Sequence, residues 1–238
     1  MNKTDVLGVS FVNASMFEAV EQGIRAMAGH EGKYAVAPDS EMLLAARKSK
    51  KLMNAIKGAE LVLPAGSGII YASRILGIPI EKKISAYDYA SALMARMGEK
   101  NMSVLILTGD EETLKPAIER VARRYPGIRI SGCLYGEDPQ AITEAVDQAE
   151  PDLLLVGLDT PAQELWMRKN AGKRQVGLML GFGKELNILA GKMAPVPQKW
   201  RDSGFEWLYK LIREPWLILR MLKRTGLIFA ALQRRLLG

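Results

Sequence analysis

The chain has 238 residues, of which 48% are hydrophobic and 25% are charged, and its formal net charge is +7. This composition is typical of a folded protein with a sizeable core, and it excludes a disordered chain. The single cysteine, Cys133, excludes an internal disulfide, and the single histidine, His30, excludes a histidine-based metal site. We therefore expect one domain, or one domain with an appendage, that uses no metal ion and no other cofactor.

In chain order, the opening sequence MNKTDVLGVS has no apolar run like that of a secretory signal, which favours a cytoplasmic protein. A short apolar start at 6–13 and a helix at 14–28 follow. Short apolar runs then alternate with amphipathic segments along the chain. The apolar runs predict strands at 33–39, 59–65, 103–109, 128–136, 152–159 and 175–183. The amphipathic segments predict helices at 40–57, 67–76, 87–98, 111–124, 137–149 and 161–171.

This alternation indicates right-handed β-α-β crossovers and therefore a mostly parallel sheet with helices on both faces. The expected fold class is α/β, with a Rossmann-like core over residues 1–197. In such sheets, ligands bind beyond the carboxyl ends of the strands. Most of the predicted ends contain glycine or a short polar residue, and they lie at 37–39, 64–68, 108–110, 135–136, 159–161 and 181–183.

The turn Gly66-Ser67-Gly68 follows a predicted strand and begins a predicted helix. A glycine-rich turn of this kind can hold a phosphate with backbone N–H groups and the positive end of a helix. Gly109 lies at the end of another predicted strand and would permit an equally close approach. The alternative is an ordinary helix entry, because glycine is common there in any α/β fold. The turn matches neither the three-glycine dinucleotide fingerprint nor a P-loop, which leaves a nucleotide-sugar diphosphate as the candidate ligand.

The last part of the chain, residues 198–238, has a different composition from the rest. It holds nine lysines or arginines against three acidic residues, and three of the four tryptophans. We place a boundary near 195–197 and predict a basic helical appendage, broken at Pro215. Its charged residues interrupt every apolar run well short of the length needed to span a bilayer.

A basic helix rich in tryptophan and leucine is suited to lying in the interface of an anionic membrane. The residues predicted to contact the membrane are Trp207, Lys210, Trp216, Lys223 and Arg224. The alternative is a helical pair packed on the domain or on a neighbouring subunit, and the sequence leaves open whether the chain forms a homo-oligomer. Nucleic acid is a weaker candidate partner, because the apolar residues exceed what phosphate contacts require.

Taken together, these segments resemble the WecG/TagA/CpsF glycosyltransferases of bacterial cell-surface polymer synthesis, over essentially the whole chain. The longest and most specific match is G-x-E-W-L-Y-x-L-I-x-E-P at 204–215. The other matches are P-x-x-E at 38–41, P-x-G-x-G at 64–68, the helix start at Asp88, P-x-Q-E-x-W at 161–166 and A-G-K at 190–192.

The resemblance implies transfer of an N-acetylmannosamine-type sugar from UDP to a polyprenyl-diphosphate-linked sugar, with inversion and without a metal. It also implies a peripheral position on the inner face of the cell membrane. The turn at 66–68 would then line the sugar-nucleotide pocket, with Gln163 in the same cleft. Arg213 and Arg220 lie in the appendage, where the family uses arginines to close over the diphosphate.

The chain departs from the family at the position of its proposed catalytic aspartate, where this sequence has Ala65. One explanation is a relocated base: Asp39 ends the strand that we expect beside the one ending at Ala65, so its carboxylate could reach the acceptor hydroxyl. The second is a noncatalytic relative that binds a sugar nucleotide or a lipid head group. Helix capping is the alternative role for Asp39, and for Asp88 it is favoured over ligand contact.

Overall fold

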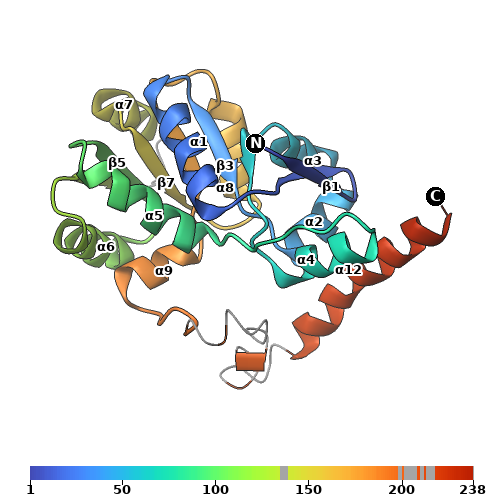
Figure 1. The fold of residues 1–238 in the computed structure, drawn as a ribbon. Coiled ribbons are helices and arrows are strands. Elements are labelled where there is room, and N and C mark those ends of the chain that lie inside the picture. The colour runs from blue at the N-terminus through green and yellow to red at the C-terminus, as the bar shows by residue number, and fades with distance from the viewer. Residues whose placement is uncertain (135–138, 198–199, 201–207, 210–211, 213–217, 238) are drawn as a thin grey trace.

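The computed structural model describes residues 1–134, 139–197, 200, 208–209, 212 and 218–237 (Figure 1). Its centre is a six-stranded sheet in which every neighbouring pair of strands is parallel. This confirms the predicted α/β fold. The strand order is β4 (Leu61–Val62), β3 (Lys33–Val36), β8 (Leu178–Gly181), β7 (Leu153–Gly157), β5 (Ser103–Thr108) and β6 (Arg129–Leu134).

Helices cover both faces of the sheet, because side chains of each strand alternate between two apolar clusters. On β3, for example, Ala35 belongs to one cluster and Tyr34 and Val36 to the other. The Ala35 face is covered by α1 (Met16–Ala28), α5 (Ala86–Gly98), α6 (Glu111–Arg124) and α9 (Glu185–Ala190). The opposite face is covered by α2 (Ser40–Lys48), α3 (Lys50–Lys57), α4 (Ser67–Ile75), α7 (Pro139–Ala149) and α8 (Ala162–Asn170). The last helix, α12 (Ile218–Leu237), packs outside this layer.

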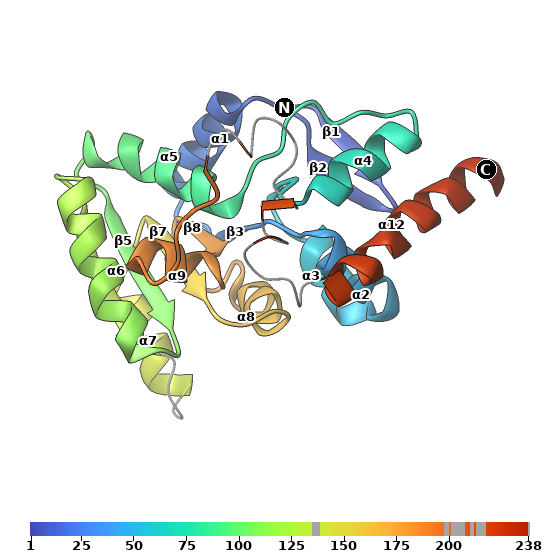
Figure 2. The same cartoon turned by 90° about the horizontal axis from the view of Figure 1, so that it is seen from below.

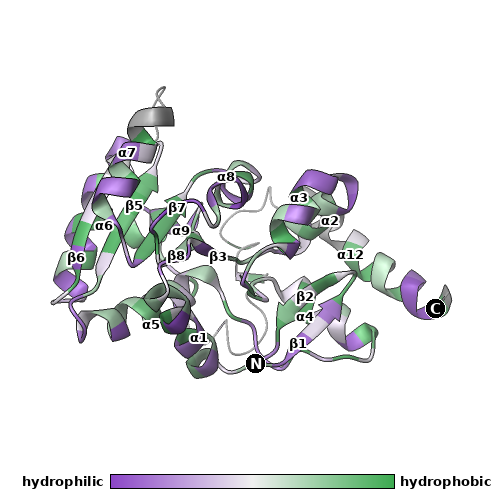
Figure 3. Ribbon diagram, turned by 90° about the horizontal axis from the view of Figure 1, so that it is seen from above, coloured by the Kyte–Doolittle hydropathy of each residue, from purple (hydrophilic) through white to green (hydrophobic). Residues whose placement is uncertain are grey.

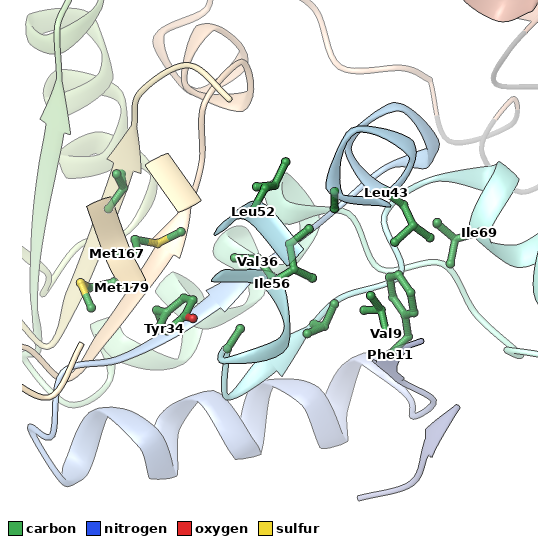
Figure 4. Packing of buried hydrophobic residues seen from close by; sticks show 14 of the residues in the cluster. Val9, Phe11, Tyr34, Val36, Leu43, Leu52, Ile56, Ile69, Met167 and Met179 are labelled. Atoms are coloured by element: carbon green, nitrogen blue, oxygen red, sulfur yellow. The ribbon is translucent and has the colours of Figure 1, made fainter. Parts of the chain in front are cut away.

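The central strands are buried on both sides, as their continuous apolar sequences predict. In Figure 3, β5 and β7 are coloured hydrophobic along most of their length. Figure 4 shows the cluster on the Tyr34 face, where Met167 of α8 lies near Met179 of β8. The Tyr34 hydroxyl is buried there and donates a hydrogen bond to the Ala55 carbonyl oxygen.

Residues 6–13, which the sequence identified only as a short apolar start, belong to an antiparallel hairpin. Its strands are β1 (Lys3–Val6) and β2 (Val9–Val12), in a separate two-stranded sheet. The turn residues Leu7 and Gly8 have φ angles of 54° and 86°, as tight hairpin turns require. The Asp5 carboxylate accepts a hydrogen bond from the Gly8 N–H at 3.0 Å.

The prediction of one helix at 40–57 is wrong, because the chain forms α2 and α3 with a break at Ser49. Ser49 has an extended backbone, with φ −130° and ψ 105°, and its N–H still bonds to the Ala46 carbonyl. Its side-chain oxygen accepts from the Leu52 N–H at 3.4 Å and so caps α3. Serine favours such caps over helix interiors, which explains the interruption.

The C-terminal helix α12 packs on α4 and α2 through the buried side chains of Leu227 and Ala231. Arg235 donates a hydrogen bond to the Ile75 carbonyl at 2.9 Å, at the end of α4. Figures 1 and 2 both show the last part of α12 extending beyond α4, away from the sheet. The predicted helix break at Pro215 lies outside the described residues. Within the described part of the chain, no helix is both long enough and apolar enough to cross a bilayer.

Candidate active site

Asp39 lies at the carboxyl end of β3 and is the N-cap of α2. One of its carboxylate oxygens, Oδ1, accepts a hydrogen bond from the Met42 N–H at 2.9 Å, so the residue has the expected capping role. The side chain is half-buried, and no described residue donates a hydrogen bond to the second oxygen. Because β3 pairs directly with β4, Asp39 lies beside the turn that contains Ala65, as predicted.

The turn Gly66-Ser67-Gly68 forms the N-terminus of α4, and its glycines lie against Asp39 and Ser40. A β-carbon on Gly66 would be 3.1 Å from the Asp39 Cα, and one on Gly68 would overlap the Ser40 hydroxyl. The glycines therefore let the first turns of α2 and α4 approach each other. Gly66, as the N-cap of α4, supplies no side-chain hydrogen bond to the helix. The N-terminus of α4 therefore has no side-chain cap, as predicted for this turn, and it lies close to Asp39.

Gln163 lies in the first turn of α8 and connects the ends of β7 and β8. It is only 7% exposed, and its side-chain oxygen accepts from the Gly183 N–H at 2.9 Å. Its amide nitrogen donates to Glu164 Oε1 at 2.6 Å. The glycines at 181 and 183 leave room for this side chain, since a β-carbon on either would come within 3.3 Å of it. Gln163 therefore fixes the edge of the sheet where β8 ends.

Glu164 was not predicted as a site residue, although it belongs to the P-x-Q-E-x-W segment. Its side chain is 1% exposed, and Oε2 is buried without a hydrogen-bond partner among the described residues. Burial raises the pKa of the Glu164 carboxyl, the Gln163 hydrogen bond opposes this, and the nearby Asp39 carboxylate raises it further. A glutamate in the first turn of a helix is normally exposed, so its sequence position gave no signal of burial.

A cavity of about 390 Å³ opens at the carboxyl ends of β5, β7 and β8. Gly109, which was predicted as a site residue, lines this cavity. Gly183 also lines it, and the Gly183 N–H donates a hydrogen bond to the side chain of Gln163. The turn at 66–68 and Asp39 lie on the β3 and β4 side and do not line this cavity. Its lining residues are Thr108, Gly109, Asp110, Thr113, Gly157, Leu158, Asp159, Gly183, Lys184, Leu186 and Asn187.

Asp110, at the rim of the cavity, is the N-cap of α6. Its carboxylate accepts from the Glu112 N–H at 3.0 Å and from the Thr113 hydroxyl. Lys192 Nζ lies 3.1 Å from the same carboxylate and 3.7 Å from that of Glu112. The Thr113 hydroxyl and the Lys192 ammonium hold the pKa of Asp110 below its usual range. Lys192, from the A-G-K segment, is thus paired with two acidic residues beside the cavity.

Of the remaining predicted residues, the structure describes the side chain of Asp88 alone. Asp88 lies in the first turn of α5 but is not its cap: Ser85 is the N-cap, and its side-chain oxygen accepts from the Asp88 N–H at 3.1 Å. The Asp88 carboxylate accepts from the Ser85 hydroxyl at 2.7 Å. Arg220, Lys223 and Arg224 lie on α12, but their side chains are outside the described structure. Arg213, Trp207, Lys210 and Trp216 lie outside the described residues altogether. Among the described residues, no three His, Cys, Asp or Glu side chains are grouped in a way that could hold a metal ion.

Comparison with known proteins assigns this chain to a family. The model of the glycosyl transferase WecG/TagA/CpsF family matches residues 4–238. Three relatives bear the name N-acetylglucosaminyldiphosphoundecaprenol N-acetyl-beta-D-mannosaminyltransferase. The protein from Bacillus spizizenii strain W23 is 25% identical over 86% of this chain and 80% of its own length. The proteins from Bacillus subtilis strain 168 and Staphylococcus aureus strain MW2 are 24% and 25% identical over 76% and 89% of this chain, and over 72% and 85% of their own lengths.

Proposed function

Because the chain belongs to the WecG/TagA/CpsF glycosyltransferase family, we propose that it transfers an N-acetylhexosamine to a polyprenyl-diphosphate-linked sugar in cell-surface polymer synthesis. The names of the relatives support an acceptor of the N-acetylglucosaminyl-diphosphoundecaprenol type and an N-acetylmannosamine-like donor sugar. We propose UDP as the carrier of the donor, inversion at the anomeric carbon, and a reaction without a metal ion.

The observation that carries this proposal is the cavity at the ends of β5, β7 and β8. Its volume of about 390 Å³ falls in the range of small-molecule sites, and it lies where ligands of parallel sheets bind. Gly109 and Gly183 permit close approach of a ligand to the backbone. Lys184 in the lining could neutralise the leaving diphosphate, a task that we also assign to Arg213 and Arg220.

For the proton transfer, we assign the role of general base to Asp39. Ala65 cannot accept a proton, whereas Asp39 ends the neighbouring strand and has one carboxylate oxygen without a described hydrogen bond. In the proposed step, the acceptor hydroxyl oxygen bonds to the anomeric carbon as the bond to the diphosphate breaks. The hydroxyl proton passes to Asp39 and the electron pair leaves with UDP.

We further propose that α12 brings the protein to the inner face of the membrane, where the lipid acceptor lies. Leu232 and Leu236, one turn apart on this helix, are 40% and 83% exposed, and Arg234 and Arg235 lie between them. Such a surface combines apolar contacts with the acyl boundary and cationic contacts with anionic headgroups.

The second candidate function is binding without turnover, and the observation in its favour is Ala65 in the turn beside Asp39. Calorimetry with UDP and UDP-N-acetylmannosamine, followed by product analysis with an N-acetylglucosaminyl-diphosphate lipid acceptor, separates the two functions. Transfer of the sugar with release of UDP supports the enzyme. Tight binding of UDP without any product in the presence of acceptor and vesicles would instead support a sugar-nucleotide sensor.

A further inference from the structure

A second cavity opens between α2, α12 and the turn of the β1–β2 hairpin. It shares no described lining residue with the cavity at the ends of β5, β7 and β8. Its volume of about 290 Å³ is just below the roughly 300–1,000 Å³ of sites for drug-sized ligands, so it suits a compact group. Three of its lining side chains can donate hydrogen bonds, and the other two are apolar. The described lining residues are Leu7, Arg47, Ala230, Gln233 and Arg234.

The packing of α12 on α2 brings two arginines to this cavity. A β-carbon on Gly226 of α12 would be 3.5 Å from the side chain of Leu44 of α2, so the two helices touch there. On α2, Arg47 follows one turn after Leu44. On α12, Arg234 follows two turns after Gly226. Each arginine therefore reaches the cavity from a different helix, and Figure 2 shows the two helices side by side.

The cations at this cavity are only partly neutralised. Arg47 is exposed and has no ion-pair partner among the described residues. Arg234 lies 3.5 Å from the Asp5 carboxylate, which also accepts the Gly8 N–H in the hairpin turn. Beside the same turn, Lys57 Nζ would be 3.9 Å from a β-carbon on Gly8. Among the described contacts, one carboxylate thus faces three cations.

The helices around the cavity are also free of acids over most of their sequences. Residues 42–59, which cover most of α2 and all of α3, include five lysines or arginines and no acidic residue. The α12 sequence likewise has five lysines or arginines and no acidic residue. Together these ten cations exceed the net charge of +7 of the whole chain, so the rest of the chain is slightly acidic on balance. An anion is therefore attracted to this side of the protein.

The chemistry of the lining favours a phosphate group that is carried by a lipid. A guanidinium group can bind two phosphate oxygens through parallel N–H bonds, and the Gln233 amide can add another donor. Leu232 and Leu236 are exposed and flank Gln233 on the surface of α12, so apolar side chains adjoin the cavity. A soluble phosphate gains nothing from these leucines, whereas the acyl chains of a phospholipid can bury them.

We propose that this cavity binds the phosphodiester of one anionic phospholipid between Arg47 and Arg234, with a further hydrogen bond from Gln233. The acyl chains of that lipid lie against the two exposed leucines of α12. This inference rests on the proposed membrane role of α12 and specifies the group that the protein recognises. Arg47 lies in the last turn of α2, about 12 Å along the helix axis from Asp39 at its start. The headgroup site is therefore separate from the proposed base, and α2 connects them.

The test uses charge-conserving variants of the full-length protein, because it must separate recognition of a phosphate from general attraction. Arg47→Lys and Arg234→Lys are combined in one variant, and Arg74→Lys is its control. Arg74 is an exposed arginine in the last turn of α4, on which α12 also packs, and it is not among the described lining residues. Flotation is measured with phosphatidylcholine vesicles, with and without phosphatidylglycerol, and urea unfolding checks the fold of each variant.

We expect the lysine pair to weaken binding to phosphatidylglycerol vesicles by about tenfold, because lysine keeps the charge but loses the parallel hydrogen bonds. Arg74→Lys should float like wild type. Asp5→Asn should bind about fivefold more tightly, the effect of one unit charge at an anionic surface. It removes the acid beside Arg234, and its side-chain oxygen can still accept the Gly8 N–H.

Equal flotation of the lysine pair and wild type would end the headgroup site but leave the membrane role of α12 in place. Failure of wild type itself to float would end both. In that case, calorimetry with glycerol 3-phosphate and inorganic phosphate, and retention of a DNA duplex, would identify what the cations bind instead. Binding of either phosphate that is lost in the lysine pair would assign the cavity to a soluble ligand. Binding of the duplex that is lost in the same variant would assign it to nucleic acid.

Discussion

Gly66 lies directly against Asp39: a β-carbon on Gly66 would be 3.1 Å from the Asp39 Cα and 3.2 Å from its Cβ. The start of α4 and the start of α2 are thus fitted to each other at the position where the family resemblance places the catalytic turn. The close approach of Asp39, and not the backbone of residue 66, favours glycine at this position, because the φ of −97° is open to any residue.

We therefore expect Gly66→Ala to displace Asp39 and to destabilise the protein by about 1–3 kcal/mol, the usual cost of overpacking. Urea unfolding measures the stability, and transfer kinetics measure the displacement of Asp39. The control is Gly226→Ala in α12, where the nearest side-chain atom would be 3.5 Å away, an ordinary contact. Alanine at that helical position should stabilise by up to about 1 kcal/mol. Equal stability of Gly66→Ala and wild type would show that the two helix starts can separate freely.

Asp39→Asn should abolish transfer without unfolding the protein. Asparagine caps a helix about as well as aspartate, so the hydrogen bond to the Met42 N–H can be kept while the proton acceptor is lost. We expect kcat to fall by about 10²–10⁴, with a melting temperature close to that of wild type. Unchanged transfer by Asp39→Asn would rule out Asp39 as the base.

Ala65→Asp is the complementary change, because it restores an acid to the turn next to Asp39. Ala65 is half-buried and partly open to solvent, so a carboxylate can be accommodated. We expect transfer by Ala65→Asp to equal or exceed that of wild type, and the double variant with Asp39→Asn to regain part of the lost activity. A double variant as inactive as Asp39→Asn alone would show that this turn cannot supply the base.

Asp110 should contribute to a loss of stability in acid. Its pKa is lowered in the folded protein by the Thr113 hydroxyl and by Lys192, so its contribution is complete above the ordinary aspartate pKa. That contribution is lost as pH falls through the lower, folded value. Urea unfolding between pH 7 and pH 2 should therefore show a smaller decline for Asp110→Asn than for wild type.

The same ion pair can be tested from its other partner. Lys192→Gln should raise the pKa of Asp110, measured by NMR titration of its carboxyl carbon, without removing the bond from Thr113. The effect should shrink in high salt, because the Asp110 side chain is 51% exposed. Lys184→Gln, which removes a cavity lysine of another element, is the control and should leave that pKa in place. An unchanged Asp110 pKa in Lys192→Gln would show that the ion pair has no strength in solution.

Membrane binding should depend on the exposed leucines of α12. The double change Leu232→Ser and Leu236→Ser should reduce flotation with phosphatidylglycerol-containing vesicles by about tenfold or more, given the energy of burying each leucine. Phe17→Ser is the control, because Phe17 is 69% exposed on α1, on the opposite face of the sheet. Flotation of the double variant at the wild-type level, or an equal loss in Phe17→Ser, would contradict the role of α12.

The sequence determined the class of the fold and most of its elements. Apolar runs such as SVLILT at 103–108 have no polar alternation, which identifies strands buried on both faces. Glycine and capping residues between these runs located the helix starts at Ser67, Glu111 and Ala162 to within one or two residues. Sequence patterning did not find the break at Ser49, because serine is compatible with both a helix interior and a cap.

The tertiary structure decided which strand ends meet. The last strand, β8, inserts between β3 and β7, so that Asp39, Gly183 and the start of α8 come to one edge although they are far apart in the chain. No local pattern specifies that insertion, since it depends on how all six strands share the two apolar layers. For the same reason, only the fold revealed that Glu164 is buried. The elements that pack over a helix decide whether a glutamate in its first turn faces solvent or the interior, and the sequence of the helix does not specify those elements.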